Sequence, residues 1–89
     1  MDEQSLATLF KAVGDKSRVI ILKQLAAGEK CANDLLATLS IGQPTLSHHM
    51  QILCQSELVS CRKDGKWARY SLNPNTFRSI QSFIQSLIG

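Results

Sequence analysis

The sequence predicts a mainly α-helical domain that carries one β-hairpin. Apolar residues recur at helical spacing through most of the 89 residues, and the period changes to two only after residue 57, on both sides of Asp64-Gly65. A chain of this length forms one domain with one core and buries only about 60–65% of its unfolded surface. A deep, enclosed active site is therefore not expected.

Helical stripes and capping residues define the N-terminal part of the chain. A first helix is predicted over residues 5–12 and ends at Gly14. Asp15 is a favourable N-cap for a second helix, and Gly28 is a favourable residue just beyond its end. The apolar stripe of this second helix comprises Val19, Leu22, Leu25 and Ala26.

Two further helices follow, separated by a short break. The third is predicted over about 31–39 and stops at Ser40-Ile41-Gly42. The fourth carries Pro44 in its first turn, where proline is tolerated, and ends near Gln55. The residues expected to face the core are Leu35, Leu36 and Leu39 in the third helix, and Leu46, Met50 and Leu53 in the fourth.

The hairpin is predicted from residues 58–63 and 66–72, which flank Asp64-Gly65. Asp-Gly favours a type I′ turn, because that turn needs a positive φ at both central positions. This register pairs Arg62 with Trp67, which is then placed to stack on the guanidinium. One face of the hairpin collects Val59, Cys61, Ala68, Tyr70 and Leu72, and the other collects Ser60, Arg62, Trp67 and Arg69.

A last helix is predicted over residues 74–87, and its apolar stripe is broader than a small domain needs. The stripe has the 3-4-3 spacing of helices that pack lengthwise on each other. A homodimer joined through the terminal helices 5–12 and 74–87 is the physical interpretation, and packing on the domain's own core is the alternative. The expected dimer interface comprises Leu6, Leu9, Phe10, Phe77, Ile80, Phe83, Ile84 and Leu87.

In this order the elements predict a single winged helix-turn-helix domain over residues 1–89, with the helix-turn-helix at about 31–55 and the wing at about 58–72. The fourth helix is then expected in the major groove of DNA. It has no acidic residue from Gln43 to Ser56, which suits a surface that approaches phosphates. The expected DNA contacts are Gln43, Thr45, Ser47, His48 and Gln51 of the helix, and Arg62, Lys63, Lys66 and Arg69 of the wing.

Composition points to a reducing compartment. Ten Lys and Arg residues against seven Asp and Glu give a net charge of +3, which weakly favours a polyanionic partner. Three cysteines are not the framework of a secreted disulfide protein, and the sequence shows neither a membrane span nor a signal pattern. We expect a cytoplasmic protein with reduced thiols and no membrane partner.

Residues 9–72 resemble the ArsR/SmtB family of bacterial metal- and metalloid-responsive repressors. The most similar parts are LSHHMQIL in the fourth helix, ELV before the wing, and RKDGKWARYSL in the wing. The resemblance implies a homodimeric repressor that uses its first and last helices as the interface. Such a repressor binds a palindromic operator, releases it when an inducer binds, and is associated with the bacterial nucleoid while it holds DNA.

The inducer site of that family is only partly matched. Arsenite and soft-metal sensors of the family show the motif E-x-C-x-C-D-L, and residues 29–35 keep Cys31 and Asp34 but have Asn33 at the second cysteine. Arsenite requires three thiolates, and oxygen ligands suit soft ions poorly. The family's second site, on the last helix, is absent because that helix has no Asp, Glu, His or Cys.

Each cysteine has two interpretations. A helix N-terminus at Cys31 would lower the pKa of that thiol and make it the most reactive one, or the residue is passive. Cys54 and Cys61 are predicted to be small core residues, with an inducer role as the alternative. His48 is expected to face DNA, and His49 is expected to pack rather than to bind a metal.

The leading hypothesis is a dimeric DNA-binding repressor released by arsenite or a soft metal ion acting on Cys31 and on Cys54 or Cys61. A repressor that responds to thiol redox or persulfide chemistry, or that senses nothing, is the alternative within the same fold. A winged-helix protein-interaction module is the alternative from another class. No enzyme is expected, because the histidines that could serve Cys31 as a base lie on the expected DNA surface.

Overall fold

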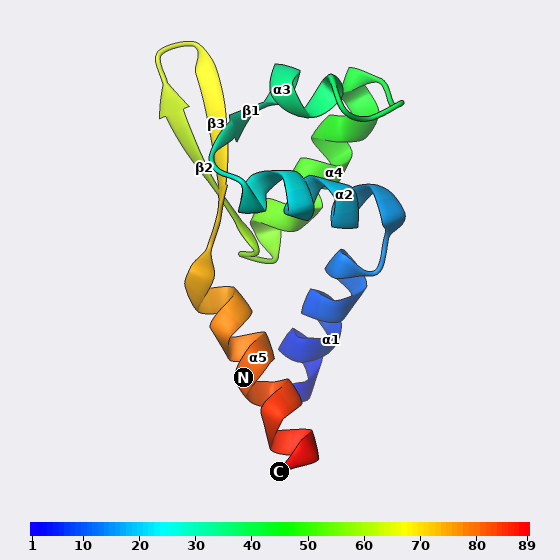
Figure 1. The fold of residues 1–89 in the computed structure, drawn as a ribbon, viewed down its shortest axis with the longest axis vertical. Helices are drawn as coiled ribbons and strands as arrows, with labels where there is room; N and C mark the ends of the chain where they lie inside the picture. Colours follow the sequence, from blue (N-terminus) through cyan, green and yellow to red (C-terminus); the bar gives the residue numbers. More distant parts are fainter.

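The computed structural model describes residues 1–89 and confirms a mainly helical fold with a small antiparallel sheet (Figure 1). The elements in chain order are α1 (Glu3–Val13), α2 (Lys16–Ala26), β1 (Lys30–Cys31), α3 (Ala32–Leu36), α4 (Gln43–Gln55), β2 (Val59–Asp64), β3 (Trp67–Leu72) and α5 (Pro74–Ile88). Helices α2, α3 and α4 form the body, the β2–β3 hairpin rises along one side, and α1 and α5 converge below it. No helix is both long and apolar enough to cross a membrane.

The capping residue predicted for α2 is confirmed. The side chain of Asp15 accepts a hydrogen bond from the backbone N–H of Arg18 at 3.1 Å, and Gly28 follows the helix with a φ of +139°. A non-glycine residue would be strained at that φ. These two residues fix where α2 begins and where the chain turns towards β1.

The core consists of buried apolar side chains from α1 to α4 and the start of β2. In α2 the predicted stripe is partly wrong. Ile21 is fully buried beside Leu25, whereas Val19 is 40% exposed and Ala26 is exposed. Residues 19–22 are all apolar, so periodicity alone could not select the inward face, and packing of α2 against α1, α4 and β3 selected it.

The third helix is shorter than predicted, and an unpredicted strand precedes it. Helix α3 ends at Leu36 rather than near residue 39. Strand β1 places Lys30 beside Tyr70 and Cys31 beside Arg69, so that the sheet order is β1-β3-β2. A strand of two residues has no periodicity from which it could be recognised.

The hairpin turn lies one residue later than predicted. The central residues are Gly65 and Lys66, and Asp64 pairs with Trp67 as the last strand pair. Gly65 has a φ of +62°, while Lys66 is not among the residues with positive φ. Positive φ at only the first central position is the pattern of a type II′ turn, whose first central residue is glycine.

This turn changes the strand pairing but preserves the two faces. Arg62 is opposite Arg69 instead of Trp67, a shift of two residues. Because side chains alternate with a period of two, an even shift leaves every residue on its predicted face. Trp67 is therefore not the cross-strand neighbour of Arg62 that the predicted stacking requires.

The terminal helices meet through aromatic side chains. The rings of Phe10 in α1 and Phe83 in α5 pack edge to face, with 5.9 Å between their centroids. Beyond this contact α5 has no buried residue, and Leu87 and Ile88 are 68% and 78% exposed. The far end of α5 is thus an apolar surface that the protomer itself does not cover.

The predicted dimer interface needs a correction at Leu9. This side chain is only 4% exposed because it lies in the protomer's own core, so it has no surface to offer a second copy. Phe77 and Ile80 also pack against that core and are only partly accessible. The exposed members of the predicted set are Phe10 and, further along α5, Ile84 and Leu87.

Candidate nucleic-acid interface and thiol sites

Helix α4, which we call the recognition helix, separates its side chains cleanly into two faces. It begins after Gly42 with Pro44 in its first turn, and it buries Leu46, Met50 and Leu53. The five polar residues predicted to contact DNA are all exposed. These residues are Gln43, Thr45, Ser47, His48 and Gln51. The exposed face therefore offers hydrogen-bonding groups without any carboxylate that would repel phosphate.

A partly buried polar contact joins the recognition helix to α2. The Arg18 guanidinium donates from Nε to the carbonyl oxygen of Ala12 at 2.6 Å, and its Nη1 lies 3.1 Å from Nδ1 of His49. Because guanidinium is only a donor, Nδ1 of His49 is the acceptor in this contact. His49 is buried, as expected for a packing residue, whereas nothing in the sequence pattern identified Arg18 as its partner.

The carboxylate of Asp15 completes this group. Its Oδ2 lies 4.0 Å from Nδ1 of His49 and accepts the N-cap hydrogen bond from Arg18. The backbone N–H of Arg18 is the main reason that the pKa of Asp15 lies below its ordinary value, and the charge of the Arg18 guanidinium lowers it further. One short region, the junction between α1 and α2, thus positions the recognition helix through hydrogen bonds.

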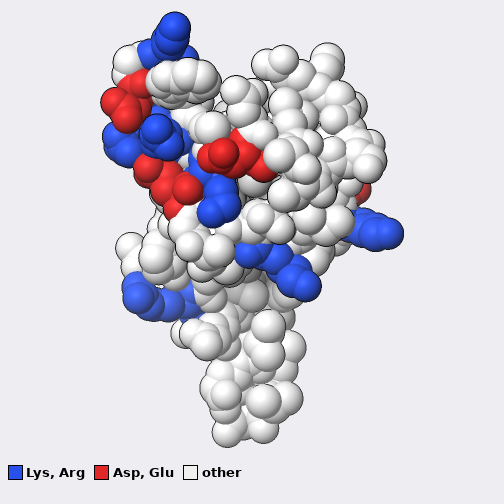
Figure 2. All heavy atoms as spheres, turned by 45° about the horizontal axis from the view of Figure 1, so that its top comes forward, with Lys and Arg blue, Asp and Glu red and all other residues white.

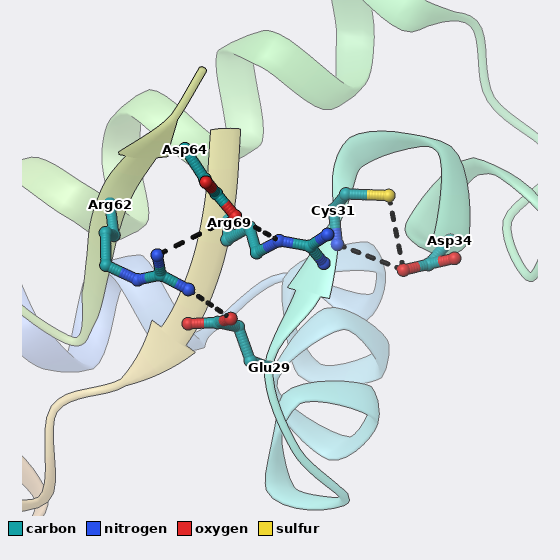
Figure 3. A network of polar contacts seen from close by, with 6 residues as sticks. All are labelled: Glu29, Cys31, Asp34, Arg62, Asp64 and Arg69. Carbon is teal, nitrogen blue, oxygen red and sulfur yellow. Dashed lines mark hydrogen bonds and ion pairs between the residues drawn. The ribbon is translucent and has the colours of Figure 1, made fainter. Parts of the chain in front are cut away.

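The four basic side chains of the wing fall into two kinds. Arg62 donates from Nη2 to Oε1 of Glu29 at 2.8 Å, and Nε of Arg69 lies 3.5 Å from Oδ2 of Asp64 (Figure 3). Lys63 and Lys66 have no carboxylate oxygen within 4.0 Å. The two lysines are therefore the wing cations that are free to meet phosphate without first leaving an internal partner.

Charge is concentrated over the wing. Figure 2 shows blue and red side chains interleaved over the hairpin, while the end of the molecule formed by the terminal helices is white. The sequence showed four basic residues and one acid, Asp64, in the wing, but it gave no sign of Glu29, whose position before β1 brings it to Arg62 only in the folded chain. The wing is a mixed-charge surface in which two cations are paired with acids.

Cys31 is held by a neighbouring carboxylate. It is the residue before α3, and Oδ2 of Asp34 accepts hydrogen bonds from both its backbone N–H at 3.1 Å and its thiol at 3.2 Å (Figure 3). These two hydrogen bonds, the backbone one first, lower the pKa of Asp34. The Cys31 thiol is therefore already hydrogen-bonded to a carboxylate of its own helix.

The other two cysteines lie on the opposite face of the sheet from Cys31. Cys31 pairs with Arg69 and Cys61 pairs with Tyr70, and adjacent residues of one strand point to opposite faces. Cys54 lines the same groove as Cys61. Cys54 is half-buried, but Cys61 is exposed, so its predicted core position is wrong. Val59 is the only buried residue of β2, and every later residue of this strand is exposed.

The thiols do not gather into a three-ligand centre within one protomer. No cluster of three or more His, Cys, Asp or Glu side chains is arranged to hold a metal ion. Arsenite and soft metals prefer several thiolates. Only two cysteines of one protomer share a groove, so a ligand that needs two thiols fits better than one that needs three.

A helix-turn-helix with an exposed, acid-free second helix and a hairpin of basic residues defines the winged helix-turn-helix class of DNA-binding proteins. The family model described as "Bacterial regulatory protein, arsR family" matches residues 15–60. The chain belongs to this family of DNA-binding transcriptional regulators.

Known proteins similar to this chain agree with the family. An arsenical resistance operon repressor of Staphylococcus aureus is 49% identical over 73 residues, which are 82% of this chain and 70% of that protein. The transcriptional repressor SdpR of Bacillus subtilis is 34% identical over 81 residues, 91% of this chain and 90% of that protein. The crystal structure of an ArsR family transcriptional regulator superposes with a TM-score of 0.90 at 18% identity, covering 98% of this chain and 90% of that one.

Proposed function

We propose that the protein is a homodimeric repressor that binds a palindromic operator in the bacterial cytoplasm and releases it when a thiol-binding inducer is captured. The observation that carries the DNA-binding part is the recognition helix. Its exposed face has no carboxylate, and its buried face is anchored by Arg18 and His49. A preorganised polar face of this kind loses little conformational entropy on entering the major groove.

Different side chains are proposed to contact the bases and the phosphates. Gln43, Thr45, Ser47, His48 and Gln51 are the candidates for base edges and nearby phosphates, because short polar groups on a groove-facing helix reach both. Lys63 and Lys66 contact phosphates from the wing. Arg62 and Arg69 stiffen the wing through Glu29 and Asp64 and reach phosphate only when those ion pairs open.

The dimer places two recognition helices on one DNA molecule. The uncovered apolar end of α5, together with Phe10 of α1, supports association of the two copies through the terminal helices. Two-fold symmetry then implies a palindromic site whose half-sites lie about one helical turn apart.

The inducer part rests on thiol chemistry. The Staphylococcus aureus relative is named an arsenical resistance operon repressor, and this chain retains three free cysteines. A trivalent arsenical is therefore the proposed inducer class. Redox or persulfide modification of the same thiols is the competing mechanism.

Selection from a random duplex DNA library tests the DNA-binding proposal without a known operator. We expect enrichment of a two-fold symmetric sequence, with binding that weakens steeply as salt rises. Gln51→Ala and His48→Ala should weaken binding to the selected sequence more than to random DNA. Arg78→Ala, a basic residue on α5, is the matched control and should bind like wild type. Absence of any enriched sequence would favour the protein-interaction module instead.

A further inference from the structure

We propose that Cys54 of the recognition helix and Cys61 of β2 form a two-thiol site for a monosubstituted trivalent arsenical, which couples capture of that ligand to release of DNA. This inference rests on the proposed repressor function and assigns its sensor site. Neither the partly matched motif at Cys31 nor the last helix contributes to it.

The two cysteines line one groove between the recognition helix and the wing. The groove has a volume of about 230 Å³ and is lined by Ser47, Met50, Gln51, Cys54, Cys61 and Tyr70. Ser47, Met50, Gln51 and Cys54 follow one another at the i, i+3, i+4, i+7 positions of a single helical stripe. Cys61 and its strand partner Tyr70 come from the wing. The groove thus joins the two elements that are proposed to read DNA.

Burial is the main influence on the pKa of two groups in this groove, Cys54 and Tyr70. Burial raises the pKa of the Cys54 thiol, and the neighbouring Cys61 raises it further. Burial also raises the pKa of Tyr70, with added contributions from Cys61 and then Cys54. The shared groove places the three groups together, and the raised pKa keeps Cys54 protonated, so that its proton can leave with a hydroxyl group of the arsenical.

The number of thiols selects the ligand. A hydrated monosubstituted arsenical, R–As(OH)2, has two exchangeable hydroxyl groups. Two As–O bonds break and two As–S bonds form, while the two thiol protons leave with the hydroxyls as two water molecules. Arsenic stays trivalent, so no oxidant or reductant takes part. Inorganic arsenite has a third exchangeable position, for which this groove holds no third thiol.

The lining of the groove also suits the organic substituent. The ring of Tyr70 provides partly accessible aromatic surface beside the thiols, and the buried side chain of Met50 forms the floor of the groove. Cavities of roughly 150 Å³ hold a benzene molecule in other proteins. An aryl group on arsenic therefore has room beside the ring of Tyr70, where it would displace water from aromatic surface.

A ligand bound in the groove would affect the surface that is proposed to contact DNA. Ser47 and Gln51 line the groove and also belong to the exposed face proposed to contact bases. A substituent seated between them obstructs that face, and two As–S bonds tie the exposed strand β2 to the recognition helix. The wing can then no longer move relative to the recognition helix, and this movement is needed for the wing to dock on the phosphate backbone.

Cys31 cannot serve as a third ligand in the same protomer. Its side chain is on the opposite face of the sheet, beside Arg69, and its thiol already donates to Asp34. Cys31→Ser keeps a hydrogen-bond donor for Asp34 and is therefore a conservative control for general thiol effects.

The first test measures capture without DNA. Full-length reduced protein is mixed with phenylarsine oxide and analysed by intact-protein mass spectrometry and by titration of free thiols. We expect one phenylarsenic group per protomer, with loss of the Cys54 and Cys61 thiols, in wild type and in Cys31→Ser. Cys54→Ser and Cys61→Ala should each prevent stable capture. Cys61 is exposed, so its alanine variant is expected to fold normally, and circular dichroism checks this.

The second test measures coupling by fluorescence anisotropy with the selected DNA. Phenylarsine oxide should weaken binding by about tenfold or more in wild type and Cys31→Ser, an ordinary size for allosteric coupling. It should leave Cys54→Ser and Cys61→Ala unaffected. Capture that depends on Cys31, equally tight capture of inorganic arsenite, or capture with no effect on DNA would each overturn the proposal. So would a Cys54–Cys61 disulfide formed with hydrogen peroxide in a protein that does not capture the arsenical.

The two tests separate the failure of this inference from failure of the proposed function. A protein that selects no DNA sequence but still captures phenylarsenic at Cys54 and Cys61 contradicts the repressor function and the coupling, while the two-thiol site stands. A protein that binds DNA specifically but does not capture the arsenical contradicts the site alone.

Discussion

Nη1 of Arg18 lies 3.1 Å from Nδ1 of His49, a contact that joins α2 to the recognition helix across 31 residues of sequence. The same guanidinium holds the carbonyl oxygen of Ala12 at the end of α1. Three helices that meet at the base of the DNA-reading surface therefore share one side chain.

Arg18→Met is expected to destabilise the fold by about 1–3 kcal/mol, because it leaves the Ala12 carbonyl and His49 Nδ1 without their partner. Urea unfolding measures this loss. Lys16→Met, an exposed position on the same helix, should change stability by less than about 0.5 kcal/mol. Equal effects of the two substitutions would show that the partly buried contact has no special role.

Asp15 makes the stability of this region depend on pH. The N-cap hydrogen bond from Arg18 lowers the pKa of its carboxyl group, so the folded-state value lies below the unfolded value of about 3.9. Its stabilising contribution is fully present above the unfolded pKa and is lost as the pH falls through the folded pKa. Asp15→Asn retains a capping oxygen. It lacks the carboxylate charge, so it should be less stable than wild type near pH 7 and lose less stability than wild type below about pH 4. Urea midpoints at both pH values test this, and parallel curves would exclude it.

The two kinds of wing cation predict different effects on DNA binding. Lys63→Ala and Lys66→Ala should each weaken operator binding and reduce the slope of log affinity against log salt by about 1, the loss of one phosphate contact. Glu29→Gln should strengthen binding, because it removes a negative charge and frees Arg62.

Protein stability provides the check on the wing variants. The Arg62–Glu29 pair is largely exposed, so Glu29→Gln should cost less than about 1 kcal/mol. Weaker DNA binding by Glu29→Gln would indicate that the ion pair orients Arg62 for DNA instead of holding it back. Anisotropy titrations over a range of salt concentrations distinguish the two outcomes.

The uncovered end of α5 predicts the oligomeric state. Ile84→Asp places a charge on the apolar stripe and should convert the dimer to a monomer, with a large loss of affinity for the two-fold symmetric site. Ser82→Asp adds the same charge at an exposed position outside the stripe and should remain dimeric. Light scattering after size-exclusion chromatography reports the masses. A monomeric wild-type protein, or a dimeric Ile84→Asp variant, would refute this interface.

The sequence by itself determined the class of the fold and the candidate DNA face. Helical periodicity placed α4, and the absence of acids from Gln43 to Ser56 distinguished its outer face. Alternation separated the two faces of the hairpin correctly even though the turn lies at Gly65-Lys66, because a shift of two residues preserves a period of two. Local patterns of this kind depend only on neighbours in the chain.

The tertiary structure decided what depends on contacts between distant residues. It selected Ile21 over Val19 as the buried face of α2, paired Arg18 with His49 and Arg62 with Glu29, and added β1 to the sheet. It also separated Cys31 from the groove shared by Cys54 and Cys61. Spacing along the chain cannot show which thiols share a site, because that depends on the strand register and on how the wing packs against the recognition helix.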